Sequence, residues 1–212
     1  MLKAALFDLD GVVFDTEPQY TFFWGEQCRE FHPEKPGLEK EIKGQTLIQI
    51  FDKHFCGELQ AVRQTITDRL NAFEQKMSFD YVNGFETFVG SLRAKGIKTA
   101  VVTSSNNAKM QSVYVKHPEF KDMFDVILTS ENFTQSKPHP DCYLTAARIF
   151  GLSSDECIVF EDSFNGLKSG RSAGMKVIGL STTNSREAIK TYSDMVISDY
   201  SELNINMCES LL

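Results

Sequence analysis

Two patterns of hydrophobic residues divide the chain. Short continuous apolar runs, typical of buried parallel strands, alternate with stretches whose apolar residues recur every three or four positions, as in amphipathic helices. The runs cover residues 4–7, 97–102, 124–128, 157–160, 176–180 and 195–197. Repeated alternation of strand and helix predicts an α/β fold with a mainly parallel sheet and helices on both faces.

Residues 16–80 break this alternation, because no strand pattern occurs there. Apolar residues at helical spacing predict helices over residues 20–31, 47–55 and 59–77, with Thr46 as the N-cap of the second. We therefore predict a small helical cap domain over residues 16–80. It is inserted into a core domain built from residues 1–15 and 81–212.

Composition narrows the classes of function. The chain has 212 residues, and 42% of them are hydrophobic, which is enough for one sizeable core. The net charge of −7 disfavours long-range attraction to nucleic acids or anionic lipids, and no apolar run approaches the ~20 residues of a membrane span. Five scattered cysteines without a CxxC pair indicate reduced thiols. We expect a soluble, cytoplasmic, monomeric protein that binds neither nucleic acid nor membrane.

Two aspartates follow the first predicted strand. Asp8 and Asp10 come directly after it, and Gly11 allows the chain to turn at once. Residues two apart in an extended segment point the same way, so both carboxylates can reach one small volume. Close carboxylates repel each other unless a cation lies between them, and Mg²⁺ prefers oxygen ligands. Taken alone, the segment fits an ordinary Asp-Gly turn equally well.

Polar clusters also follow later strands. They are Thr103-Ser104-Ser105, Lys137-Pro138 and Glu161-Asp162. The carboxyl ends of parallel strands share one edge of a sheet, so these clusters and the Asp8 segment can line one pocket. Singly, each fits a helix cap or a solvated turn. Together they supply a carboxylate nucleophile, an acid/base, hydroxyl donors, a lysine and metal ligands, which phosphoryl transfer requires.

The four segments, in this order and spacing, resemble the motifs of the haloacid dehalogenase (HAD) superfamily. Asp8-Leu9-Asp10-Gly11-Val12-Val13-Phe14-Asp15-Thr16 resembles the first motif, and Glu161-Asp162-Ser163-Phe164-Asn165-Gly166 resembles the last. The resemblance covers nearly the whole chain and is strongest for the β-phosphoglucomutase-like phosphatases and mutases. It implies a Rossmann-like core with a helical cap inserted after the first motif.

The resemblance also implies roles for individual residues. Asp8 would be the nucleophile, and Asp10 would protonate the leaving group and later activate water or an acceptor hydroxyl. Thr103 and Lys137 would hold the phosphoryl group. Asp162 would bind Mg²⁺ with Asp8 and the backbone carbonyl of Asp10, while Glu161 would be a direct or indirect ligand. Further substrate-binding candidates are Thr16, Lys43, Gly44, Ser104, Ser105 and Asn107. A hinge role explains Thr16 better than substrate binding does. Lys43 is explained equally well as a solvated lysine on the cap surface.

The choice between hydrolase and mutase depends on the cap. Asp10 argues against the dehalogenase branch, which lacks this acid/base. The resemblance places Leu47 where β-phosphoglucomutase has a phosphate-binding arginine, and Tyr20 where it has a histidine. Loss of a bidentate phosphate anchor is not conservative. We therefore predict a Mg²⁺-dependent phosphatase of small phosphorylated metabolites, with sugar phosphates as the favoured substrates. A phosphohexomutase is the alternative.

Two other readings are weaker. One is an inorganic pyrophosphatase, and the other is a non-enzymatic phosphate-binding or receiver-type protein that uses clustered acids and a phospho-aspartate. The helical insertion and the Glu161-Asp162 pair fit a receiver domain poorly.

Overall fold

The computed structural model describes residues 1–43 and 45–212, and a single parallel sheet forms its centre. The six strands, which confirm the six predicted runs, are β1 (Ala4–Phe7), β2 (Lys98–Val102), β3 (Val126–Leu128), β4 (Cys157–Glu161), β5 (Lys176–Leu180) and β6 (Met195–Ile197). Their order is β3-β2-β1-β4-β5-β6. The order reverses between β1 and β4, and ligands of open α/β sheets bind at such a switch point.

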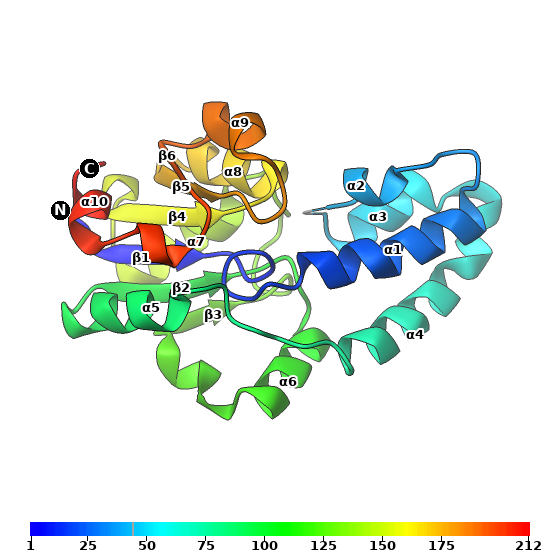
Figure 1. The fold of residues 1–212 in the computed structure, drawn as a ribbon, viewed down its shortest axis with the longest axis horizontal. Helices are drawn as coiled ribbons and strands as arrows, with labels where there is room; N and C mark the ends of the chain where they lie inside the picture. Colours follow the sequence, from blue (N-terminus) through cyan, green and yellow to red (C-terminus); the bar gives the residue numbers. More distant parts are fainter. Residues whose placement is uncertain (44) are drawn as a thin grey trace.

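Helices cover both faces of the sheet (Figure 1). One face packs against α5 (Phe85–Ala94), α6 (Asn107–Lys116) and α10 (Ile205–Glu209). The other packs against α7 (Asp141–Phe150), α8 (Phe164–Ser172) and α9 (Arg186–Ile189). Side chains of a strand alternate between faces, so in β1 Phe7 belongs to the first core and Leu6 to the second. Burial on both faces fixes where β1 ends and hence where Asp8 lies.

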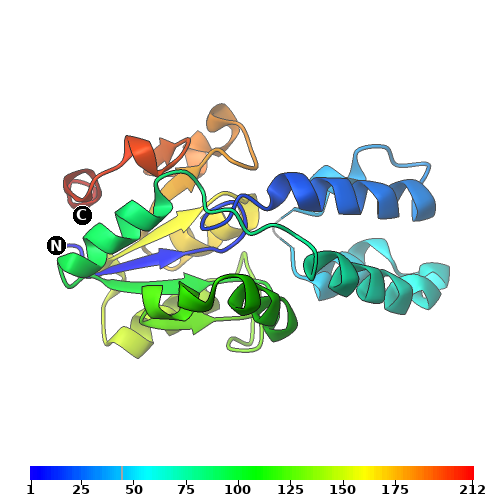
Figure 2. The same ribbon diagram turned by 60° about the horizontal axis from the view of Figure 1, so that its bottom comes forward.

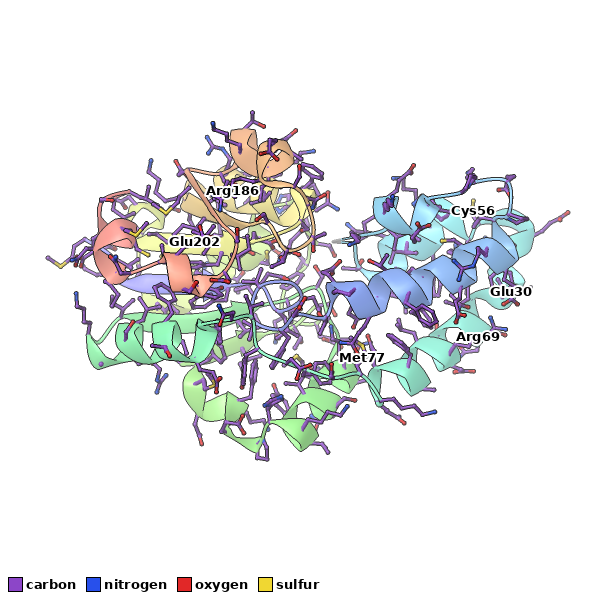
Figure 3. The ribbon with its side chains drawn as sticks, viewed as in Figure 1. Glu30, Cys56, Arg69, Met77, Arg186 and Glu202 are labelled. Carbon is purple, nitrogen blue, oxygen red and sulfur yellow. The ribbon has the colours of Figure 1, made fainter. Side chains whose placement is uncertain are left out.

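The inserted segment is helical, as predicted, and lies beyond the carboxyl ends of the strands (Figures 1 and 2). Its helices are α1 (Glu17–Phe31), α2 (Leu38–Glu41), α3 (Leu47–His54) and α4 (Arg63–Glu74). They enclose an apolar cluster of their own that includes Trp24 and Phe55. Arg69 of α4 and Glu30 of α1 point toward one another (Figure 3), with 2.7 Å between Nη1 and Oε2. We call this segment the cap.

Local sequence explains most of the cap. Thr46 is the N-cap of α3, as predicted, and its hydroxyl accepts a hydrogen bond from the Gln49 N–H, while the Gln49 side chain accepts from the Thr46 N–H. The single helix predicted over residues 59–77 is wrong. A 3-10 helix at Gly57–Val62, with no fully buried residue to anchor it, precedes α4, and α4 ends at Glu74. The four-residue α2 is too short to show a helical period.

The chain passes between core and cap twice, at one place. The Asp15 N–H donates to the Asp80 carbonyl at 2.8 Å, and the Val82 N–H donates to the Val13 carbonyl at 2.9 Å. Phe14 also forms an antiparallel bridge with Tyr81. The two crossing segments therefore form one short backbone-paired connection. The domain boundaries at residues 15/16 and 80/81 stay a prediction. No helix in the described part of the chain is long and apolar enough to cross a membrane.

Candidate active site

Lys137 holds Asp8 at the end of β1. The Asp8 N–H donates to the Phe160 carbonyl at 3.0 Å, which continues the pairing of β1 with β4. The Lys137 ammonium donates to Asp8 Oδ1 at 2.5 Å, to Glu161 Oε1 at 2.6 Å and to the Val102 carbonyl at 2.9 Å. Only 2% of the Lys137 side chain is exposed. Burial lowers the pKa of Lys137, but the Asp8 and Glu161 carboxylates outweigh this and raise it. Lys137 is therefore a fixed cation beside Asp8.

Three carboxylates meet beside this lysine. Asp8, Glu161 and Asp162 each offer one oxygen, and these oxygens lie within 4.8 Å of one another. Burial raises the pKa of Asp8 to about 7; Glu161 and Asp10 add to this effect, and Lys137 opposes it. Burial, followed by the nearby Glu17 carboxylate, also raises the pKa of Asp162. Charges disfavoured in this way are relieved by a divalent cation, so the acid cluster fits a hard metal ion.

Glu161 is already well supplied with donors. Its Oε1 accepts from Lys137 and from the Tyr143 hydroxyl at 2.8 Å, and its Oε2 accepts from the N–H of Asp162 at 3.1 Å and from the N–H and hydroxyl of Ser163. Ser163 is also the N-cap of α8. Asp8 and Asp162 have fewer protein donors, so they are the better candidates for direct metal ligands.

The Asp10 carboxylate points away from the acid cluster. Its Oδ1 accepts from the Thr16 hydroxyl at 2.5 Å, and its Oδ2 accepts from the Ser105 hydroxyl at 3.1 Å and from the Lys109 ammonium at 2.5 Å. Two aspartates two residues apart thus enter different environments, one among acids and one among donors. Three donors thus engage the Asp10 side chain, and metal binding by its backbone carbonyl stays a prediction.

A cavity of about 610 Å³ separates the cap from the core. Asp8, Asp10, Thr103, Ser104, Ser105, Lys137 and Asp162 line it from the core. The cap contributes the polar residues Glu17, Tyr20, Lys43 and Glu74, together with apolar side chains that include Leu47. The cavity has room for a small metabolite that reaches both aspartates.

The structure brings most of the predicted residues to this cavity. The Thr103 hydroxyl accepts from the Ser105 N–H at 3.0 Å, which orders the loop after β2. The Lys43 ammonium lies 3.2 Å from Glu17 Oε2, an ion pair within the cap. The Asn107 side-chain oxygen accepts from Thr129 at 3.2 Å, and its neighbour Asn106 lines the cavity.

Thr16 is fully buried, donates to Asp10 and directly precedes α1; its role as a hinge residue stays a prediction. Gly44 lies outside the described residues.

Several residues of the site carry no motif that the sequence reveals. Lys109 contacts Asp10 from the first turn of α6, and Tyr143 reaches Glu161 from α7. Glu74, at the end of α4, accepts from the Tyr20 hydroxyl at 2.7 Å. The Thr183 hydroxyl donates to Asp162 Oδ2. Lys109 is four residues after Ser105, so its position after the second motif was the available signal.

Comparison with known proteins defines the class. Residues 5–180 match the model of the haloacid dehalogenase-like hydrolase family. The chain belongs to this family, within the subfamily that contains β-phosphoglucomutases and related phosphatases. It is a phosphatase-type hydrolase of that family.

Two curated relatives match over most of their own length. Hexitol phosphatase A of Escherichia coli is 29% identical over 184 residues, which cover 84% of this chain and 82% of that protein. The β-phosphoglucomutase of Bacillus subtilis is 26% identical over 219 residues, which cover 97% and 93%. A crystal structure of a HAD hydrolase from Entamoeba histolytica superposes with a TM-score of 0.84 at 24% identity, covering 99% of each chain. The predicted family and fold are confirmed.

Proposed function

We propose that the protein is a Mg²⁺-dependent phosphatase of phosphorylated sugars or polyols that acts through a phospho-aspartate on Asp8. The observation that carries this proposal is that the two aspartates lie in different environments at the same cavity. Asp8 lies beside Lys137 and the acid cluster, whereas Asp10 turns to hydroxyl and ammonium donors at the wall of the same cavity. Such a pair can supply a nucleophile and a general acid/base.

The reaction proceeds in two transfers. An Asp8 oxygen attacks phosphorus and forms an O–P bond, the bond from phosphorus to the leaving oxygen breaks, and Asp10 gives that oxygen its proton. Water then attacks phospho-Asp8, Asp10 takes a proton from the water, and inorganic phosphate leaves with the Asp8 carboxylate restored. Lys137 stays beside Asp8 throughout and offsets the charge of the phosphoryl oxygens.

Asp8, Asp162 and the Asp10 carbonyl would hold Mg²⁺, and Glu161 would orient them through its own hydrogen bonds. The donor set consists of oxygens, and burial disfavours the charges of Asp8 and Asp162, which suits a small divalent cation. Bound Mg²⁺ would neutralise charge on the transferring phosphoryl group.

The cap supports hydrolysis over mutase activity. Leu47 lines the cavity at the position where the resemblance places an arginine, and the Tyr20 hydroxyl is engaged by Glu74. The named relatives that act on hexitol phosphates and phosphoglucose support a sugar or polyol phosphate as substrate. A phosphohexomutase is the second candidate, favoured by the β-phosphoglucomutase relative.

Phosphate release from a panel of hexose, hexitol and pentose phosphates, with Mg²⁺ and with EDTA, tests the proposal. We expect Mg²⁺-dependent release that Asp8→Asn abolishes. Asp10→Asn should abolish release but keep metal binding, since its carbonyl remains. Asp15→Asn, in the same segment but exposed, is the matched control and should keep activity. Turnover by Asp8→Asn would refute the phospho-aspartate, and conversion of β-glucose 1-phosphate to glucose 6-phosphate faster than release would establish the mutase.

A further inference from the structure

Lys109 is a buried cation that lies between the core and the cap. It belongs to the first turn of α6, and its backbone N–H donates at 2.9 Å to the side-chain oxygen of Asn106, the N-cap of that helix. Only 2% of the side chain is exposed. Its ammonium lies 2.5 Å from Asp10 Oδ2 in the core. A buried ammonium without partners is strongly unfavourable, so its contacts determine where Lys109 can lie.

The Lys109 ammonium also contacts one cap side chain, Tyr20. It lies 4.6 Å from the centroid of the Tyr20 ring, on α1, a distance that gives a cation–π interaction. The Tyr20 hydroxyl donates to Glu74 Oε1, on α4, at 2.7 Å. Burial raises the pKa of Glu74, and the charge of Lys109 opposes this effect, so the two side chains interact electrostatically. The start of α1 thus contacts the ammonium through Tyr20, and the end of α4 is linked to it through the Tyr20–Glu74 hydrogen bond.

These contacts lie where the cap is attached. Tyr20 is in the first turns of α1 and Glu74 ends α4, so both are next to the segments that pass between core and cap. Figure 1 shows α6 beside the lower end of α4 at this junction, and the two helices are in contact. Movement of the cap would shift Tyr20 and Glu74 relative to α6, and Lys109 would follow the Tyr20 ring or lose its contact with it.

We propose that Lys109 is a positioning residue that couples the orientation of the Asp10 carboxylate to the position of the cap. This inference rests on the proposed function, in which Asp10 protonates the leaving oxygen. In the structure, Lys109, Thr16 and Ser105 hold that carboxylate. Thr16 lies in the segment that enters the cap, whereas Lys109 belongs to the core and its ammonium also contacts a cap side chain, the Tyr20 ring. The cap then sets the direction in which Asp10 presents its proton.

The test compares two leaving groups in one variant. An alkyl phosphate such as sorbitol 6-phosphate needs a proton on its leaving oxygen, whereas p-nitrophenyl phosphate has a stable leaving anion and needs little help. The value of kcat/KM reports steps up to the first irreversible transfer, in which Asp10 acts as the acid. We expect Lys109→Met to lower kcat/KM by about 100-fold for the alkyl phosphate and by less than about fivefold for the aryl phosphate.

Lys116→Met is the matched control. Lys116 ends the same helix, and its ammonium contacts the Met77 carbonyl and the Phe79 ring of the segment after α4 rather than Asp10. Figure 3 labels Met77 at this junction. We expect its effect on the two substrates to be equal and small. Partial unfolding lowers both rates equally, so the ratio of the two effects distinguishes misplacement of Asp10 from loss of folded protein.

A double-mutant cycle tests the link to the cap. Tyr20→Leu removes the ring that Lys109 contacts, and it should reproduce part of the selective loss on the alkyl phosphate. In the Lys109→Met background it should add no further selectivity, because the link is already broken. Additive effects would overturn the coupling. Equal losses on both substrates in Lys109→Met would overturn the positioning role while leaving the proposed function intact. Inactivity of the wild type on every phosphate would refute the proposed function itself.

Discussion

Removal of the Lys137 ammonium should destabilise the protein in a manner that depends on pH. Lys137→Met keeps an unbranched side chain in the buried position but deletes the charge. It leaves Asp8 and Glu161 without the cation that lies 2.5 and 2.6 Å from their oxygens. It also removes the donor to the Val102 carbonyl. Asp162 lies in the same acid cluster, so three carboxylates would share one buried volume.

The expected loss follows from this geometry. Breaking a buried ion pair by removing one partner costs about 3–5 kcal/mol of unfolding free energy. The folded-state pKa of Asp8, about 7, already exceeds its ordinary value of 3.8, so the folded protein binds an extra proton between these values and loses stability as the pH rises through them. Lys137 lowers the pKa of Asp8, so removal of Lys137 raises this pKa further. At pH values above the raised pKa, each added pKa unit costs about 1.4 kcal/mol of unfolding free energy. The destabilisation should therefore be greater near pH 8 than near pH 5.5.

Urea unfolding in EDTA at these two pH values measures the effect, and a repeat in Mg²⁺ tests whether a metal ion replaces the missing charge. Mg²⁺ should recover part of the loss at the higher pH. Lys98→Met is the matched control, since the Lys98 side chain is 54% exposed and pairs with Asp125 at 2.8 Å. That exposed pair should contribute less than about 1 kcal/mol. Equal losses for Lys137→Met at both pH values would refute the charge argument.

Three further outcomes follow from the same site. Gly166→Ala should destabilise the protein by about 3 kcal/mol and weaken metal binding, because the added Cβ would lie 1.8 Å from the Glu161 carboxyl carbon. Gly90→Ala has open space around the added Cβ and should stabilise the protein by about 0.5–1 kcal/mol. Thermal unfolding and metal titration of both variants measure the difference. Tyr143→Phe should cost about 1.5–3 kcal/mol in urea unfolding, since it removes a buried hydrogen bond to a charged carboxylate. The Mg²⁺ dissociation constant from calorimetry should rise about tenfold for each pH unit below about 7, because the metal displaces a proton from Asp8; a constant affinity over that range would show that Asp8 is not a ligand.

Sequence patterns predicted the sheet because its strands are buried on both faces. A strand such as β1, with all four residues buried, appears as an uninterrupted apolar run, and the polar residue that follows it marks its end. The position of Asp8 follows directly from this rule, whereas β4 extends one residue past its apolar run to the buried Glu161, and Asp162 follows. The spatial order of the strands is a different matter, because β1 and β4 are far apart in the sequence and pair only in the fold.

The environment of each aspartate was harder to predict. Helical spacing places Lys109 on α6, but it does not say that the ammonium reaches Asp10 at 2.5 Å. Tyr143 likewise has the spacing of a core residue, and only the packing of α7 against the sheet brings its hydroxyl to Glu161. Such contacts depend on how helices pack over sheet ends, and periodicity carries no information about that geometry.

The paired crossing between Val13–Asp15 and Asp80–Val82 has a consequence for how this architecture can change. Both ends of the cap leave the core at one point, where backbone hydrogen bonds hold them together. These bonds do not depend on which side chains the two segments carry. A segment attached in this way can be lengthened, shortened or exchanged without a break in the sheet or a shift of Asp8. Evolution can therefore change which substrate enters the cavity while the reacting groups stay as they are. A chimaera that carries a relative's cap on this core would be joined at the two crossing segments.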